Sequence, residues 1–306
     1  MGAGMVLHQT GTRAIDVLGG LIKKMPVTGA TFLIGSLAIS GLPPFNGFVS
    51  EFLVYFGGFK GVTLNGTSFA LSLLGIVSLA IIGGLALACF TKVVGVVFQG
   101  EPRSEAARVD GEGGISMLIP MLILAGACIA IGVFPAGFMG MAFKAVGGLG
   151  LGLGQVPLDS VTSLGANITR AALMVLALLV GLGLLRQLLY WGKPVDRSGT
   201  WGCGFTQPTV RMQYTGSSYA GSILEFFRAI VPLREEHRAI NGRFPEGTRY
   251  VSHVDDVAER GAGRLVVRPL MALFDRLRWI QHGDIHLYVG YILLAIVAAL
   301  LFVWRG

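Results

Sequence analysis

The sequence has few charged residues and few cysteines. Asp, Glu, Lys and Arg make up 13% of the 306 residues, about half the share that is usual in a soluble globular domain. Because 53% of the residues are hydrophobic and the mean hydropathy is +0.69, an ordinary soluble domain is excluded. The three cysteines, Cys89, Cys128 and Cys203, lack the spacing of metal ligands. We therefore expect no disulfide framework, no metal site and no electron-transfer cofactor on this chain.

Motifs of soluble enzymes are also missing. The sequence contains no HExxH, no CxxC and no Ser/His/Asp grouping, and none of its glycine pairs has the strand-to-helix context of a phosphate-binding loop. Its 46 glycines follow no G-x-y period and lie within apolar runs, where small residues allow helices to pack closely in lipid. The composition therefore predicts a membrane protein that carries no catalytic centre of its own.

Long apolar runs are what the sequence has instead. A helix of about 20 residues crosses the hydrocarbon core of a bilayer, and five runs are long enough: residues 27–59, 67–98, 115–141, 168–191 and 285–304. We predict an all-α integral membrane protein with about five transmembrane helices. One of these helices is expected to be broken at Pro43-Pro44, because proline removes a backbone donor and clashes with the preceding turn.

Basic residues predict the orientation in the membrane. With five crossings, residues 1–26, 99–114 and 192–284 fall on one side, and these segments carry most of the Lys and Arg. The opposite side receives only Lys60, Lys144 and Arg305. Because positive loops face the cytoplasm, we expect residues 192–284 to lie in the cytoplasm of a prokaryotic cell, beneath its inner membrane. The net charge of +7 is then explained by basic loops on the cytoplasmic side of the membrane, and no nucleic-acid partner is expected.

The sequence predicts five consecutive parts. Residues 1–26 read as the end of a truncated helix and a cytoplasmic loop, 27–191 as the main transmembrane helices, 192–252 as an irregular cytoplasmic loop, 253–283 as an amphipathic helix and 284–306 as a last transmembrane helix. Within 253–281 apolar residues recur every three to five positions. We expect this helix to kink at Pro269 and to lie along the membrane or along neighbouring helices; a solvated cytoplasmic helix is the alternative.

Glu51 is the sole charged residue between Pro26 and Phe59. Charges within lipid are costly and often functional, and Glu51 follows the predicted break by about one turn. Freed backbone groups at a broken helix can hold water or ions beside a titratable side chain. Burial disfavours the charged form of a carboxylate, whereas a nearby cation favours it. We therefore predict that Glu51 loads and releases protons; a permanent pair or a side chain reaching the interface is the alternative.

Lys92 is the sole charged residue between Thr67 and Gln99. It lies within seven residues of the loop that begins at Gln99, a distance over which a lysine side chain can reach the membrane surface. A role in proton transfer and a purely interfacial position are both consistent with the sequence. We retain Lys92 as a second candidate for proton translocation.

Several stretches resemble a known family. The run IDVLGGLIKKMPVTGATFLIGSLAISGLPPFNGFVSEFLVY is similar to the broken helix of antiporter-like membrane subunits. Such subunits occur in respiratory complex I, in multisubunit cation/proton antiporters and in membrane-bound group 4 nickel–iron hydrogenases. The loop TWGCGFTQPTVRMQYTGSSYA and the ending IQHGDIHLYVGYILLAIVAALLFVW resemble the hydrogenase-4 component B and formate hydrogenlyase subunit 3 branch.

The resemblance implies a function in a larger complex. In this family buried lysines and glutamates form a proton path, and Glu51 matches the ionisable residue of the broken helix, at the outer end of that path. Lys92 falls where related subunits carry a basic residue. The resemblance further implies a non-catalytic subunit of an oxidoreductase complex, with nickel–iron and iron–sulfur centres on partner subunits and with other membrane subunits as neighbours.

The family also has an earlier set of helices that precede the broken one. This sequence is therefore expected to be a C-terminal part, and either a fragment or one product of a split gene whose other product supplies the missing N-terminal helices. Three functions remain open from the sequence. The first is proton translocation in a hydrogenase complex; the second is a subunit of a Na⁺/H⁺ antiporter or of an NADH-quinone oxidoreductase; the third is a truncated assembly brace.

Overall fold

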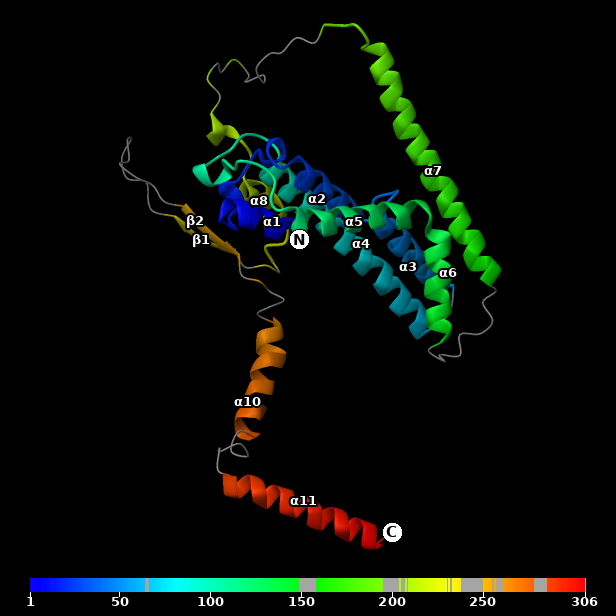
Figure 1. The fold of residues 1–306 in the computed structure, drawn as a ribbon, viewed down its shortest axis with the longest axis vertical. Coiled ribbons are helices and arrows are strands. Elements are labelled where there is room, and N and C mark those ends of the chain that lie inside the picture. Colours follow the sequence, from blue (N-terminus) through cyan, green and yellow to red (C-terminus); the bar gives the residue numbers. More distant parts are fainter. Residues whose placement is uncertain are drawn as a thin grey trace. The chain divides into compact units, whose positions relative to one another are not determined.

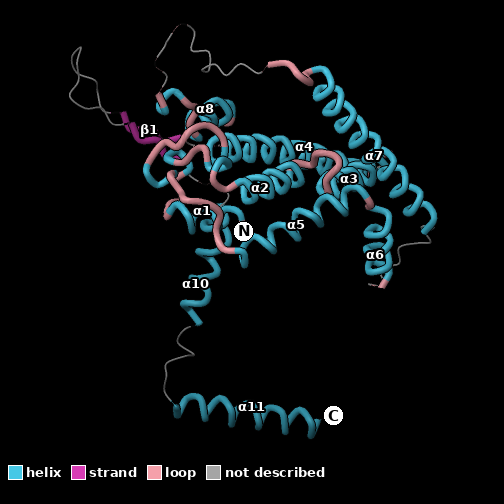
Figure 2. The backbone as a smooth tube through the Cα atoms, turned by 45° about the horizontal axis from the view of Figure 1, so that its top comes forward, coloured by secondary structure: helices cyan, strands magenta, loops and turns pink. Residues whose placement is uncertain are grey.

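The computed structural model divides the chain into two compact units, Met1–Ala220 and Gly221–Gly306. Most of the described residues are helical (Figures 1 and 2). The structure describes residues 1–63, 66–148, 158–194, 204, 207, 209–229, 231, 233–237, 250–254, 256, 261–277 and 285–305.

The first unit is built from packed helices. Helix α3 packs along α4 and α5, α2 packs against α4 and α5, and α6 packs along α7 (Figures 1 and 2). The helices are α1 (Gly2–Thr10), α2 (Pro26–Ile39), α3 (Asn46–Val62), α4 (Thr67–Val93), α5 (Ile115–Val133), α6 (Pro135–Gly147), α7 (Leu158–Leu189) and α8 (Gly216–Phe226), which continues into the second unit.

Among the described residues, three helical stretches are long and apolar enough to cross a membrane: Thr67–Phe98, Ile115–Val133 and Ser163–Leu189. Shorter apolar helices are Pro26–Ile39 and Val289–Phe302. Large apolar side chains cover the outside of these helices, as expected for surfaces that face lipid or other membrane helices. The described part of the chain is thus a helical membrane protein, and the count of five crossings stays a prediction.

The run predicted as one span over 115–141 is two helices. Helix α5 ends at Val133, Phe134 leaves the helical conformation with φ −121° and ψ 57°, and α6 starts at Pro135. The physical reason is the proline, which disfavours helical geometry in the residue before it but suits the first position of a new helix. Helix α6 accordingly takes a different direction from α5 (Figure 1).

A compact core lies at one end of the first unit. Met5 of α1, Leu18 and Leu21 of the following loop, Met25 and Phe98 are almost fully buried together. Phe98 ends a π-helical turn, Val94–Phe98, which continues α4. A smaller core joins Val49, Met139 and Ile168 from α3, α6 and α7. The packing is therefore dense around the loops at one end, while the long helices stay exposed.

Several described residues of the segment 192–252, which the sequence predicted as an irregular loop, form regular secondary structure. It contains a 3₁₀ turn at Val210–Met212, helix α8 and strand β1 (Leu233–His237). Strand β1 pairs in antiparallel fashion with β2 (Tyr250–Val254), with Leu233 opposite Val254 and His237 opposite Tyr250. The aromatic and β-branched residues of YVSHV favour a strand, and glycine and proline elsewhere in the segment concealed this pattern.

The structure describes part of the predicted amphipathic helix of 253–283. Residues 253 and 254 belong to β2, and the described helical residues run from 261 to 277 as a π-helical turn, Gly263–Val267, followed by α10 (Arg268–Leu277). The change of helix type comes directly before Pro269, where a kink was expected. Residues 278–284 lie outside the described residues, and α11 (Ile285–Arg305) forms the apolar C-terminal helix.

Candidate functional site

A break interrupts the first membrane segment between α2 and α3. Helix α2 ends at Ile39 and α3 begins at Asn46, and the residues between them include Pro43 and Pro44, which are joined by a cis peptide bond. Gly41 adopts φ +66°, a left-handed conformation that favours glycine. The two half-helices contain 14 and 17 residues, so each is only about 20–25 Å long. Together they replace one continuous span.

Glycines let neighbouring backbone approach this break. A Cβ atom at Gly47 would overlap the carbonyl oxygen of Ala38, at the end of α2. A Cβ atom at Gly132 of α5 would lie 2.6 Å from Cα of Phe45 and would overlap the carbonyl oxygen of Pro44. The backbone of the break is therefore enclosed by α2 and α5 without intervening side chains, which holds its position.

The Glu51 carboxylate lies over Gly41. A Cβ atom at Gly41 would be 2.7 Å from the carboxyl carbon of Glu51 and 2.9 Å from its Oε1. On the neighbouring helix α4, a Cβ atom at Gly83 would be 3.8 Å from Oε2. Glu51 is the sixth residue of α3 and is half-buried. The structure thus places this carboxylate between the helix break and α4, beside two residues that have no side chain.

Two polar side chains at this position have no protein partner among the described residues. Among the described residues, none donates a hydrogen bond or forms an ion pair with the Glu51 carboxylate. The Oδ1 atom of Asn46, in the first turn of α3, is buried and also has no partner among them. Because a buried polar group is costly without a hydrogen bond, the Asn46 oxygen suits a water molecule, whereas the Glu51 carboxylate can take water, a proton or a cation. Asn46, the first residue of α3, was not singled out from the sequence.

Lys92 lies away from Glu51. It is half-buried in the last turn of α4, directly before the π-helical turn Val94–Phe98. It comes nine residues after Gly83, which corresponds to about 13 Å along the helix axis. The structure therefore does not join the two predicted residues as an ion pair. Turns of π-helix often occur at functional positions, so Lys92 stays a candidate for proton transfer.

A glutamate that the sequence did not single out holds the start of α2. The Glu112 carboxylate accepts hydrogen bonds from the backbone N–H groups of Val27 and Thr28, at 2.5 and 3.1 Å, and from the Thr28 hydroxyl at 2.6 Å. Thr28 is fully buried. A negative group at a helix N-terminus satisfies free N–H groups and complements the helix dipole. The loop after α4 thereby anchors the half-helix that leads to the break.

Arg103 links three segments that are distant in sequence. Its guanidinium donates to the carbonyl oxygens of Leu18, Val96 and Tyr214, at 2.9, 3.2 and 2.7 Å. Val96 belongs to the π-helical turn after α4, and Tyr214 precedes α8. The sequence showed Arg103 only as one of the basic residues of a loop, because its partners are backbone atoms.

A second contact holds the start of α8 against the loop before α2. The Asp16 carboxylate accepts hydrogen bonds from the Gly216 N–H at 2.6 Å and from the Ser217 hydroxyl at 2.5 Å. Gln213 accepts a hydrogen bond from the Glu101 N–H at 2.9 Å. The sequence YTGSSYA, noted for its family resemblance, thus docks on the loops at one end of the helices.

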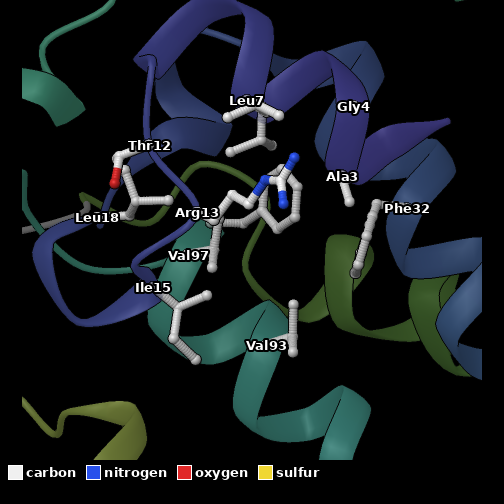
Figure 3. A pocket seen from close by; sticks show the side chains of 12 residues that line it. Ala3, Gly4, Leu7, Thr12, Arg13, Ile15, Leu18, Phe32, Val93 and Val97 are labelled. Atoms are coloured by element: carbon white, nitrogen blue, oxygen red, sulfur yellow. The ribbon is translucent and has the colours of Figure 1, made fainter.

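An apolar cavity of about 360 Å³ lies beside α1. Figure 3 shows Arg13 reaching toward Leu7 within it, with Phe32 and Val93 also in the lining. Arg13 is the sole charged residue that lines this cavity, which includes neither Glu51 nor Lys92.

The comparisons with known proteins agree with this architecture. Residues 1–82, which include the break and Glu51, match the family described as NADH:quinone oxidoreductase/Mrp antiporter, TM. Hydrogenase-4 component B of Escherichia coli is 30% identical, with 98% of this chain and 46% of that protein covered. Formate hydrogenlyase subunit 3 of the same species is 33% identical over 77% of this chain and 38% of that protein.

Proteins of Na⁺/H⁺ antiporters match a smaller part. A Na⁺/H⁺ antiporter subunit of Alkalihalophilus pseudofirmus is 34% identical over 44% of this chain and 17% of that protein. The chain spans about half the length, or less, of the curated relatives that it matches. The chain is an antiporter-like membrane protein of the NADH:quinone oxidoreductase and Mrp antiporter superfamily, similar over most of its length to hydrogenase-4 component B and formate hydrogenlyase subunit 3.

Proposed function

We propose that the chain is the C-terminal portion of a proton-translocating subunit in a membrane-bound hydrogenase complex of the hydrogenase-4 or formate hydrogenlyase type. The observation that supports this proposal best is the Glu51 carboxylate beside the helix break, between α2 and α4, which pairs with no other described residue. Such a group can bind a proton and release it without breaking a protein ion pair. Lys92, at the end of α4, is a second proton-carrying group in this proposal.

In this proposal redox chemistry takes place on partner subunits that hold nickel–iron and iron–sulfur centres. A change of charge on neighbouring helices alters the balance between neutral and charged Glu51, because a nearby cation favours the carboxylate and its loss favours the acid. The helix break supplies free backbone groups that hold water beside it. The complex would lie in the prokaryotic inner membrane with residues 192–284 in the cytoplasm, and another polypeptide would supply the preceding helices.

The test is Glu51→Gln in the complete complex, reconstituted in vesicles. Glutamine keeps the size of the side chain but cannot carry a proton, so we expect hydrogen turnover to persist while protons moved per turnover fall about tenfold. Glu105→Gln is the matched control, because its side chain is 84% exposed in a loop and makes only a surface pair with Arg108. Equal proton transport in Glu51→Gln and the control would refute the proposal.

Ion exchange without redox partners is a second candidate function. The similarity to a Na⁺/H⁺ antiporter protein favours it, although this similarity covers 44% of the chain against 98% for hydrogenase-4 component B. Purification of the tagged chain from native membranes in mild detergent, with mass spectrometry of its partners, separates the two. Nickel–iron and iron–sulfur subunits are expected for a hydrogenase complex, and small antiporter-like membrane proteins alone for an exchanger.

A further inference from the structure

The apolar cavity beside α1 has room for part of a hydrocarbon chain. Its volume is about 360 Å³, and the protein encloses it only in part. All of its lining residues except Thr12 and Arg13 are apolar. A dry apolar cavity of about 150 Å³ binds benzene, so a cavity of this size can hold about a dozen carbon atoms.

Water is a poor filling for this cavity. A buried water molecule needs about two to four polar partners, and the lining side chains offer only those of Thr12 and Arg13. The Thr12 hydroxyl already accepts a hydrogen bond from the N–H of Ala14 at 3.1 Å. An empty apolar cavity would leave its lining atoms without dispersion contacts on one side. A hydrocarbon chain supplies those contacts and needs no hydrogen bonds.

The cavity extends from a loop into the helical part of the protein. Thr12 and Arg13, at one end, belong to the loop between α1 and α2. At the other end, Ala3 lies about 10 Å along α1 from Thr10, and Phe32 lies about 9 Å into α2. Because the loop connects two membrane segments, its charged end lies at the level of lipid headgroups. The apolar end then lies at the level of acyl chains.

Arg13 brings a cation to this cavity without a protein anion. Its guanidinium reaches toward Leu7 (Figure 3), and among the described residues it forms no ion pair and donates no hydrogen bond. Two acidic side chains of nearby loops are occupied, because Asp16 accepts hydrogen bonds from the start of α8 and Glu101 pairs with Lys23. A guanidinium beside apolar side chains is costly unless an anion pairs with it. Its planar fork fits two oxygens of a phosphate group.

We propose that this cavity binds one anionic phospholipid, whose phosphate pairs with Arg13 while one acyl chain lies along α1 against Leu7 and Phe32. The lipid is anionic because the cation at the cavity lacks a protein anion, whereas a zwitterionic lipid brings an ammonium group of its own. Basic segments at the cytoplasmic surface also attract anionic lipids. The site is independent of the proton-carrying role proposed for Glu51, which does not line the cavity.

Occupancy is tested with the complete complex in vesicles that contain phosphatidylglycerol with a diazirine group in its acyl chain. After illumination, pepsin digestion and mass spectrometry locate the labelled residues. We expect labelling at residues 3–7 and at Phe32, about tenfold stronger than with a phosphatidylethanolamine probe that has the same tail. Equal labelling by the two probes would overturn the proposal. An absence of labelling at residues 3–7, as when another polypeptide covers the cavity, would also overturn it.

The headgroup contact is tested with Arg13→Gln, which should lower labelling by phosphatidylglycerol about tenfold. Lys24→Gln is the matched control, because it removes the same charge from the same loop at an exposed position that does not line the cavity. Ala3→Phe fills the apolar end and should abolish labelling while Arg13 is retained. Unchanged labelling in Arg13→Gln or in Ala3→Phe, or an equal loss in Arg13→Gln and Lys24→Gln, would overturn the site.

Discussion

At the residue scale, glycine determines where the Glu51 carboxylate lies. Gly41 provides both a left-handed backbone conformation and the open space over which the carboxylate extends. Gly83 leaves the facing side on α4 open. The position of the Glu51 carboxylate thus depends on two residues that have no side chain. A larger residue at either position would displace the carboxylate, although the carboxyl group itself would be unchanged.

Gly41→Ala should impair both stability and transport. A Cβ atom would overlap Oε2 of Glu51, and a left-handed alanine costs about 1–2 kcal/mol. We expect a lower free energy of unfolding by at least that amount in detergent denaturation, and a proton yield as low as in Glu51→Gln. Gly35→Ala is the control, since nothing lies within 4 Å of a Cβ there; an equal loss in both variants would contradict this account.

At the scale of elements, each half-helix is held by contacts from other parts of the chain. Helix α2 has only 14 residues, and short helices depend on tertiary contacts for most of their stability. Glu112 supplies one such contact at the start of α2, and Gly132 of α5 lets the break pack against a neighbouring helix. Proline alone explains the interruption, whereas these contacts explain why the interrupted segment keeps one geometry.

Glu112→Ala should loosen the start of α2. The substitution leaves two backbone N–H groups and the fully buried Thr28 hydroxyl without their acceptor, at a cost of about 2–3 kcal/mol. We expect faster hydrogen–deuterium exchange at residues 27–31, measured by mass spectrometry. Asp110→Ala, in the same loop but exposed, should leave that exchange unchanged. Unaltered exchange in Glu112→Ala would show that the cap contributes little.

At the scale of the whole molecule, segments far apart in sequence meet at one end of the first unit. Loop 99–104, the loop after α1 and the residues before α8 are joined through Arg103, Asp16 and Gln213. The hydrogen-bond acceptors of Arg103 are backbone carbonyls, so no charge pattern in the sequence indicated this junction. It ties the segment that resembles hydrogenase-4 proteins to the end of α4, near Gln99.

Arg103→Lys should release this junction. A lysine keeps the charge but lacks the planar group that reaches three carbonyl oxygens. We expect limited proteolysis within residues 209–218 to become several-fold faster as those hydrogen bonds are lost. Arg108→Lys is the matched control, because Arg108 is exposed and pairs only with Glu105 in its own loop. If both variants are cleaved at the wild-type rate, the junction does not depend on Arg103.

The sequence by itself determined the membrane class, the interruption near Pro43 and Pro44, and Glu51 as the isolated charge beside it. These features are local, because hydropathy, proline geometry and the cost of a charge in lipid act on neighbouring residues. Pro135 could have indicated that the run 115–141 divides at Phe134. The division was missed because the run is apolar on both sides of the proline. The pairing of residues 233–237 with 250–254 was not readable, because the partner of a strand is not encoded in its own local pattern.

Only the tertiary structure decided which groups meet. It separates Lys92 from Glu51 and places Gly41 and Gly83 around the carboxylate. It also directs Glu112 and Arg103 to backbone atoms in distant segments. The physical reason is that each arrangement depends on close approach between helices and on backbone partners. Every residue has the same backbone groups, so a contact with the backbone leaves no pattern in the sequence.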